Sequence, residues 1–163
     1  MTHSKTLWIE DAQGSYRPAT ADEVFEAHRK QLNQRFRRGR AIGSPADTRD
    51  YLIGQLAHEP AEIFATLYLD NRHRILDFAK HFTGTIDGCT VHPRTIIKHA
   101  LDLNAAAVIL SHQHPSGIAE PSQADQRITT RIRDALALVD VRVLDHIIVA
   151  GTDTVSFSER GLL

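Results

Sequence analysis

A short, uninterrupted apolar run constrains the fold of this chain more than any other feature. Residues 105–110 read Ala-Ala-Ala-Val-Ile-Leu, and the run is bounded by Asn104 and by the Pro-Ser-Gly at 115–117. A run of this length between turn residues is typical of a strand that is buried on both faces of a sheet. Such a strand needs helices above and below its sheet, so the run predicts a layered α/β domain.

Patterns on both sides of this run predict the remaining elements. From Glu62 the apolar period changes to two, and Asp70-Asn-Arg-His is a turn signal, so two strands form a hairpin there. Helical spacing and capping residues predict the helices. The expected helices cover residues 21–38, 44–57, 94–103 and 121–139, and the expected strands cover 62–69, 74–83, 105–110, 141–149 and 154–157. This order predicts an α/β sandwich on a mixed sheet, while residues 1–19 carry no clear period and are expected to form a loose tail.

Composition excludes several classes of protein. The 163 residues are enough for one domain with a short appendage, which we expect as a tail and basic helix over 1–40 and a hydrolase domain over 41–163. One cysteine excludes an internal disulfide framework and a cysteine-rich zinc cluster. No run of 18 apolar residues and no secretory signal occur, so we expect a cytoplasmic protein without a membrane partner. The net charge of −1 gives no overall attraction to nucleic acid.

Two histidines follow the buried strand at a spacing suited to metal binding. His112 and His114 are two residues apart on an extended chain, so their side chains point to the same side. Asp125 follows eleven residues later, in the first turn of the next expected helix. Two imidazoles and one carboxylate leave a fourth position open to water, which is the arrangement of a catalytic zinc site rather than a structural one. Zinc would lower the pKa of that water to roughly 7.

Each part of this pattern also has a simpler interpretation. A lone His-x-His is a weak signal of metal binding. Ser122-x-x-Asp125 by itself is typical of a capping box at a helix start. Glu62 begins the first expected strand, where a sheet can bring it beside the metal water as a general base, yet alone it resembles an exposed acid. His146 lies in an apolar strand and is expected to be a hydrogen-bonded core residue, or a spare ligand in place of Asp125. The joint pattern is far less common by chance than any of its parts.

The joint pattern resembles a known family. His112-Gln-His114-Pro115 followed by Ser122-x-x-Asp125 matches the JAMM motif of the JAB/MPN metalloproteases. The wider sequence resembles the bacterial RadC family. Within that family it looks most similar to the short RadC-like proteins of prophages and mobile elements. The resemblance covers about residues 40–163, and its matching segments are 91–94, 114–117, 121–125, 144–149 and 156–162.

This resemblance implies a fold, a metal centre and a reaction. The fold would be the JAB/MPN fold, related to cytidine deaminases, with an N-terminal helical extension. His112, His114 and Asp125 would ligate zinc, Glu62 would be the general base, and Ser122 would help to stabilise the oxyanion of a tetrahedral intermediate. The reaction would be hydrolysis of a peptide or isopeptide bond in a substrate that the sequence does not name.

Other functions remain open or are excluded. The basic run from Arg29 to Arg40 predicts contacts with phosphates or with an acidic partner, or else a solvated helix face. The alternative function is therefore a DNA-associated RadC-like module in DNA repair or mobile-element biology, with a structural or nuclease-like metal site. Residues 1–40 are too short for the helix-hairpin-helix region of full-length RadC proteins, so DNA binding by that region is not implied. The His-x-Glu and Pro-Cys-x-x-Cys patterns of the zinc deaminases do not occur.

Overall fold

The computed structural model describes residues 6–36, 38–84 and 91–163. Its centre is a five-stranded mixed sheet in the order β4-β3-β5-β6-β7. The strands are β3 (Ile63–Leu69), β4 (Ile75–Thr83), β5 (Ala107–Gln113), β6 (Arg142–Ala150) and β7 (Asp153–Ser156). β5 pairs antiparallel with β3 and parallel with β6, and the two outer pairings are antiparallel. Every residue of β5 is buried, as the apolar run predicts.

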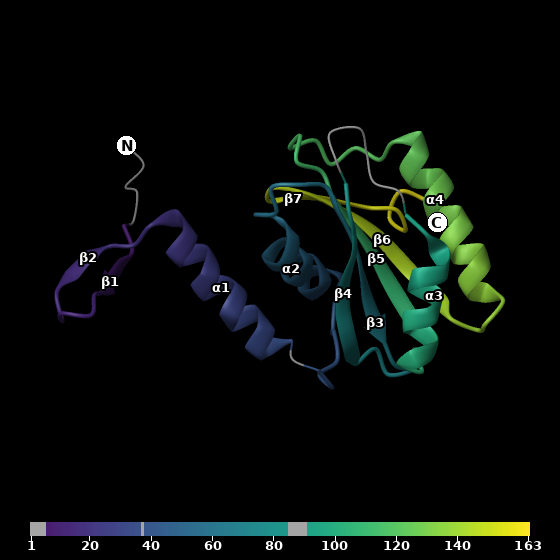
Figure 1. Cartoon of the computed structure of the whole chain (residues 1–163), viewed down its shortest axis with the longest axis horizontal. Helices are drawn as coiled ribbons and strands as arrows, with labels where there is room; N and C mark the ends of the chain where they lie inside the picture. The colour runs from purple at the N-terminus through teal and green to yellow at the C-terminus, as the bar shows by residue number, and fades with distance from the viewer. Residues whose placement is uncertain (1–5, 37, 85–90) are drawn as a thin grey trace.

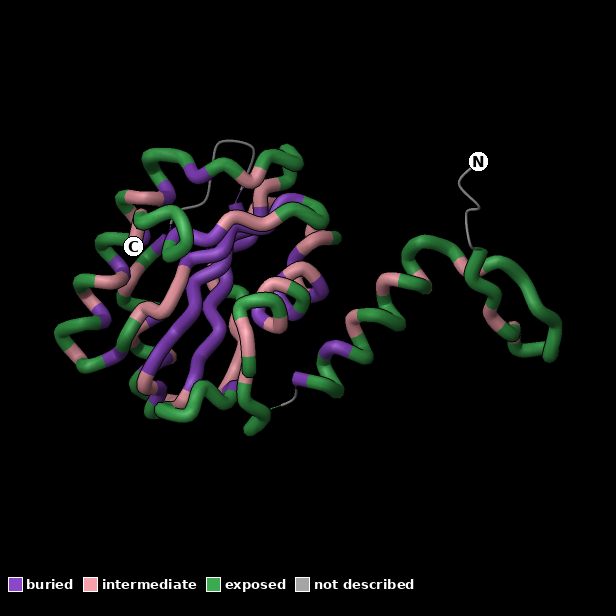
Figure 2. Tube along the Cα trace, turned by 180° about the vertical axis from the view of Figure 1, so that it is seen from behind, coloured by how far each residue is buried: buried purple, intermediate pink, exposed green. Residues whose placement is uncertain are grey.

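Helices cover both faces of this sheet (Figure 1). The helix α2 (Pro45–Leu56) packs on one face, where Leu52 and Leu56 belong to the same buried cluster as Leu67 of β3. The helices α3 (Pro93–Asp102) and α4 (Gln123–Ala137) pack on the other face, where their apolar side chains meet even-numbered residues of β3 and β5. Figure 2 shows the buried strands running between the two layers. The expected α/β sandwich on a mixed sheet is thereby confirmed.

The N-terminal helix α1 (Ala21–Arg35) leads away from this body as an arm (Figure 1). Thr20 and Glu23 form the expected capping box at its start. The helix ends three residues before the predicted position 38. The reason lies at Phe36, which leaves helical geometry at φ −110° and packs its ring 5.7 Å from the ring of Tyr51. Residue 37 lies outside the described residues.

The expectation of a loose tail over residues 1–19 is wrong for residues 8–18. The strands β1 (Trp8–Glu10) and β2 (Tyr16–Pro18) form an antiparallel hairpin. Its turn is closed by Asp11, whose Oδ1 accepts hydrogen bonds of 2.9 Å from the backbone N–H groups of Gln13 and Ser15. Gly14 supplies the left-handed conformation that the turn requires, at φ +82°. In the parts of the chain that the structure describes, no helix is both long and apolar enough to cross a membrane.

Candidate metal centre

Three side chains of the predicted site converge at the end of β5. His112 lies in β5, His114 directly follows that strand, and Asp125 lies in the first turn of α4. One imidazole nitrogen or carboxylate oxygen from each residue lies within 4.8 Å of the other two. The side chains of His112 and Asp125 are each only 7% exposed, so this polar cluster is almost fully buried. Unpaired polar groups in such a place are costly, so their partners decide what the cluster can do.

Hydrogen bonding leaves one ring nitrogen of His114 available as a ligand. His114 Nδ1 lies 2.8 Å from the backbone carbonyl oxygen of Ile118. A carbonyl oxygen only accepts, so Nδ1 carries the proton and donates it. In the neutral ring the lone pair is therefore on Nε2, which lies 3.7 Å from Oδ2 of Asp125. Anchoring of one ring nitrogen by a carbonyl is how metal-bound histidines are usually oriented.

His112 lies between two carboxylates. Its Nε2 is 2.6 Å from Oε1 of Glu62, and its Nδ1 is 2.9 Å from Oδ1 of Asp125. The first contact is a hydrogen bond, but the second lacks hydrogen-bond geometry, and Nδ1 has no hydrogen-bond partner among the described residues. With the proton on Nε2, a buried nitrogen lone pair and a carboxylate oxygen face each other, and a cation between them would remove the conflict.

Asp125 is held in place as an ionised carboxylate. Its Oδ2 accepts hydrogen bonds from the backbone N–H of Ser122 at 2.8 Å and from the Ser122 hydroxyl at 2.6 Å. Burial by itself would raise the pKa of Asp125, but the nearby rings of His112 and His114 and the Ser122 hydroxyl outweigh burial and lower the pKa. The proximity of Asp125 raises the pKa of His114 against the opposing effect of burial.

These residues fit a divalent cation. The donor set is a lone pair on His114, an unpartnered buried nitrogen on His112 and an ionised oxygen on Asp125. Two nitrogen ligands and one carboxylate oxygen are a known donor set of catalytic zinc, and they leave a fourth position open. Asp125 is both a capping residue and a candidate ligand, because its two oxygens face different partners.

The two residues predicted to be catalytic have different surroundings. Glu62 directly precedes β3, and the antiparallel register of β3 and β5 brings it against His112. Ser122 is the N-cap of α4, and its hydroxyl proton is directed at Oδ2 of Asp125. An oxyanion role for Ser122 needs that proton to change partner, and both catalytic assignments stay predictions.

Sequence reasoning missed Thr129, which lies one helical turn after Asp125. The Thr129 hydroxyl is 2.6 Å from the backbone oxygen of Asp125 and 2.6 Å from Nδ1 of His146. His146 is fully buried, so the expectation of a hydrogen-bonded core histidine is confirmed. The only sequence signal for Thr129 is its i+4 spacing from Asp125 on a helix, which places both side chains on one face.

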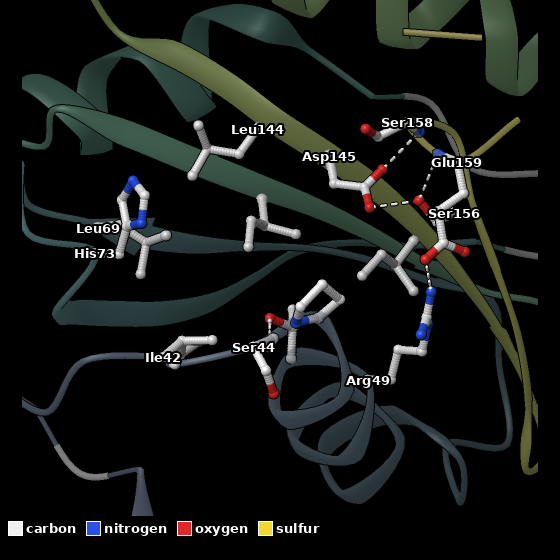
Figure 3. A pocket seen from close by; sticks show the side chains of 15 residues that line it. Ile42, Ser44, Arg49, Leu69, His73, Leu144, Asp145, Ser156, Ser158 and Glu159 are labelled. Atoms are coloured by element: carbon white, nitrogen blue, oxygen red, sulfur yellow. Dashed lines mark hydrogen bonds and ion pairs between the residues drawn. The ribbon is translucent and has the colours of Figure 1, made fainter. Parts of the chain in front are cut away.

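A separate cavity of about 310 Å³ lies on the opposite face of the sheet, beside the start of α2 (Figure 3). Asp145 lines it and accepts hydrogen bonds from the Ser156 hydroxyl at 2.6 Å and the Ser158 N–H at 2.9 Å. Arg49 of α2 pairs with Glu159 at its rim (Figure 3). These polar groups have partners that connect α2, β6 and the chain after β7, which indicates a structural role for them.

The basic run from Arg29 to Arg40 is partly neutralised by ion pairs. Arg29 pairs with Glu26 at 2.7 Å, and Arg35 pairs with Asp47 at 2.5 Å. Both arginines remain substantially exposed, so these pairs add little stability. The pairs reduce the positive charge that this helix presents to a phosphate backbone, and nucleic-acid binding stays a prediction.

Comparisons with known proteins agree with this fold. Residues 42–162 match the model of the RadC-like JAB domain. A UPF0758 protein of Thioalkalivibrio sulfidiphilus is 55% identical over 150 residues, which cover 92% of this chain and 67% of the relative. A UPF0758 protein of Nitrosococcus oceani is 56% identical over 139 residues, which cover 85% of this chain and 62% of the relative. A UPF0758 protein of Marinobacter nauticus is 45% identical over 164 residues, which cover 100% of this chain and 73% of the relative. The chain spans about two thirds of the length of these relatives, and the prophage type stays a prediction. The chain belongs to the family of RadC-like JAB domain proteins.

Proposed function

We propose that this protein is a zinc-dependent hydrolase that cleaves peptide or isopeptide bonds. The observation that carries the proposal is the buried cluster of His112, His114 and Asp125, with ligand atoms within 4.8 Å of one another. Membership of the RadC-like JAB domain family supports the choice of an amide bond as the substrate. The resemblance of the His-x-His and Ser-x-x-Asp segments to the JAMM motif supports the same choice.

The residues around the cluster have distinct tasks in this proposal. A zinc ion bound there would supply a water with a pKa near 7 and a Lewis acid for a carbonyl oxygen. Glu62 is a further carboxylate in contact with His112, and with its side chain 24% exposed it is accessible to solvent. It would accept a proton from the attacking water at its carboxylate and return that proton to the nitrogen of the leaving amine.

The protein also keeps the ligands oriented. Ile118 fixes the ring of His114 through its carbonyl oxygen, and Glu62 fixes the ring of His112 through Nε2. Ser122 holds one oxygen of Asp125 and leaves the other facing His112. Such outer partners keep ligands in place before the metal arrives, which raises metal affinity.

Metal content measured by mass spectrometry tests the proposal. The purified protein is compared with His112→Ala, Asp125→Ala and a control, Asp134→Ala, which removes an exposed carboxylate of α4 that pairs with Arg133. We expect about one zinc per chain in the wild type and in the control, and loss of zinc in both ligand variants. A wild-type protein that holds no metal and takes up none from added zinc would contradict the proposal.

A second assay addresses the bond that is cleaved. A linear peptide and a peptide branched through a lysine side-chain amide are incubated with the zinc-loaded protein, and the products are identified by mass. We expect cleavage of at least one amide bond, and its loss in Asp125→Ala but not in Asp134→Ala. Zinc binding without cleavage of either peptide would leave a metal site whose function is not amide hydrolysis.

A further inference from the structure

A buried chain of hydrogen bonds connects the helix of Asp125 to the sheet. Thr129 lies in α4 and His146 lies in β6, and the two residues are 1% and 0% exposed. The Thr129 hydroxyl oxygen is 2.6 Å from the backbone oxygen of Asp125 and 2.6 Å from Nδ1 of His146. His146 of β6 pairs in register with Leu110 of β5, the strand that carries His112. This series of hydrogen bonds therefore ends on the strand next to that of His112.

The positions of the protons follow from the chemistry of the three groups. A backbone carbonyl only accepts, so the single Thr129 proton goes to the oxygen of Asp125. The Thr129 oxygen must then accept from His146, which places the ring proton of His146 on Nδ1. The resulting order of donation runs from His146 through Thr129 to Asp125.

The other nitrogen of His146 is left without a partner. Nε2 is buried and has no hydrogen-bond partner among the described residues. Burial lowers the pKa of His146 to about 3, so the ring is neutral at pH 7 and has only the one proton on Nδ1. The ring stacks on Phe157, with centroids 4.6 Å apart, and lies 5.5 Å from the ring of Phe64. An apolar side chain in this place would avoid the unpaired nitrogen, so the donation to Thr129 is the feature that requires a histidine here.

We propose that Thr129 and His146 are positioning residues for Asp125 as a metal ligand. Ser122 holds the carboxylate of Asp125, and Thr129 holds its backbone oxygen, so both ends of the residue are fixed. His146 extends this support to the sheet, which also carries His112 and His114. The distance between the carboxylate and the two imidazoles is thereby set before a metal binds, a condition for tight binding. This inference rests on the proposed metal site.

The same helix contains a matched control. Thr130 donates a hydrogen bond of 3.0 Å to the backbone oxygen of Gln126, which repeats the i to i−4 contact of Thr129 with Asp125. Thr130 is exposed and its bond involves neither a ligand nor a histidine. Replacing either threonine by valine removes one hydroxyl from a β-branched side chain of nearly the same shape. Comparison of the two variants separates the effect of breaking the hydrogen bonds between His146, Thr129 and Asp125 from the general effect of replacing a threonine by valine in this helix.

The test is a zinc titration of the metal-free full chain against a competing chromophoric chelator. We expect Thr129→Val to weaken zinc binding roughly 10- to 100-fold, which is typical for loss of an outer partner of a ligand. Thr129→Ser keeps the hydroxyl and should stay within about threefold of the wild type, and Thr130→Val should not change the affinity. Thermal unfolding of each metal-free protein shows whether a variant has lost its fold.

A second variant covers the case in which Thr129→Val does not fold. His146→Leu removes both ring nitrogens, and the Thr129 proton can still go to Asp125, so no new buried group is left unpaired. We expect this variant to fold and to bind zinc at least tenfold more weakly than the wild type. Wild-type affinity in folded Thr129→Val or His146→Leu would overturn the inference while leaving the metal site intact. Absence of zinc binding by the wild type would instead reject the proposed function, and the inference with it.

Discussion

Oε1 of Glu62 lies 2.6 Å from Nε2 of His112, although the two residues are 50 positions apart in the chain. The antiparallel pairing of β3 with β5 brings them together, because Phe64 is the register partner of His112. Glu62 therefore has two tasks open to it at one place. It can orient the ring of His112, and it can accept a proton during hydrolysis.

Replacement of Glu62 by glutamine separates these tasks. In Glu62→Gln the amide oxygen still accepts the hydrogen bond from Nε2 of His112, but the side chain no longer takes up a proton. We expect zinc content to remain near the wild-type value and peptide cleavage to fall roughly 10²- to 10⁴-fold. The measurements are metal content and initial cleavage rate on the same preparation.

A nearby carboxylate provides the control for this variant. Glu59 forms an ion pair with Lys80, and Glu59→Gln should leave both zinc content and cleavage unchanged. If Glu62→Gln cleaves at the wild-type rate, Glu62 only orients His112 and another group must serve as the base.

The two serine caps of the domain make a second test. Ser44 at the start of α2 and Ser122 at the start of α4 each accept a hydrogen bond of 3.1 Å, from the N–H of Asp47 and Asp125 respectively. Each substitution by alanine should lower the free energy of unfolding of the metal-free protein by about 1 kcal/mol. Only Ser122→Ala should also weaken zinc binding, because only Ser122 donates its hydroxyl to a ligand oxygen. The free energy of unfolding of both variants is measured with urea, and their zinc affinity is measured by titration. Equal zinc affinities in Ser44→Ala and Ser122→Ala would show that the capping hydroxyl of Ser122 does not support the metal site.

Local sequence patterns were sufficient for the layers of the fold and for the three ligand candidates. The apolar run of β5 predicts a buried strand, and a His-x-His that continues this strand must present both rings to one side. Asp125 was recognisable from its position eleven residues after His114, in the first turn of the next helix, although the same segment also predicts a capping box.

The contacts around the ligands depend on packing that local patterns do not contain. Thr129 and His146 meet only because α4 packs on β6, and the i+4 spacing from Asp125 alone does not reveal that contact. The hairpin of β1 and β2 was missed because three-residue strands are too short to show an alternating period. Its signal is the turn at Asp11, where a side chain rather than apolar spacing closes the structure.

The attachment of the N-terminal arm depends on the absence of a side chain at Gly54. A Cβ atom added there would lie 2.3 Å from Cδ1 of Leu32, which is the single buried residue of α1. Gly54→Ala therefore forces Cδ1 of Leu32 to shift, and we expect weaker packing of α1 on α2 at a cost of about 1–3 kcal/mol, offset by about 1 kcal/mol because alanine favours a helix over glycine. Limited trypsin digestion should then cut the basic segment after α1 faster than in the wild type.

A double-mutant comparison provides the control for this prediction. Leu32→Ala removes the side chain that meets Gly54 and should itself speed digestion, so adding Gly54→Ala to Leu32→Ala should not speed it further. Zinc binding should be the same in all three proteins, because α1 and α2 lie on the face of the sheet opposite the metal cluster. If Gly54→Ala speeds digestion as much in the Leu32→Ala background as in the wild type, the proposed clash is contradicted.

His146 predicts how the stability of the metal-free protein changes with pH. Burial lowers its pKa from the ordinary value of 6.5 to about 3, and the facing rings of His112 and His114 oppose its charging while Asp125 favours it. Below pH 6.5 the unfolded chain therefore binds a proton at this residue that the folded chain does not bind. The contribution of His146 to stability is complete above pH 6.5 and is lost progressively as the pH falls toward 3.

Urea unfolding at pH 7 and pH 5 measures this contribution. A single histidine with these pKa values lowers the free energy of unfolding by on the order of 2 kcal/mol between the two pH values. His146→Leu has no titrating group at this position, so its loss of stability over the same range should be smaller than that of the wild type by about this amount. The comparison cancels the other histidines, since they titrate in both proteins. An equal loss of unfolding free energy in the wild type and the variant would show that His146 takes up its proton in the folded state at an ordinary pKa. Water would then reach the ring despite its packing against Phe64 and Phe157.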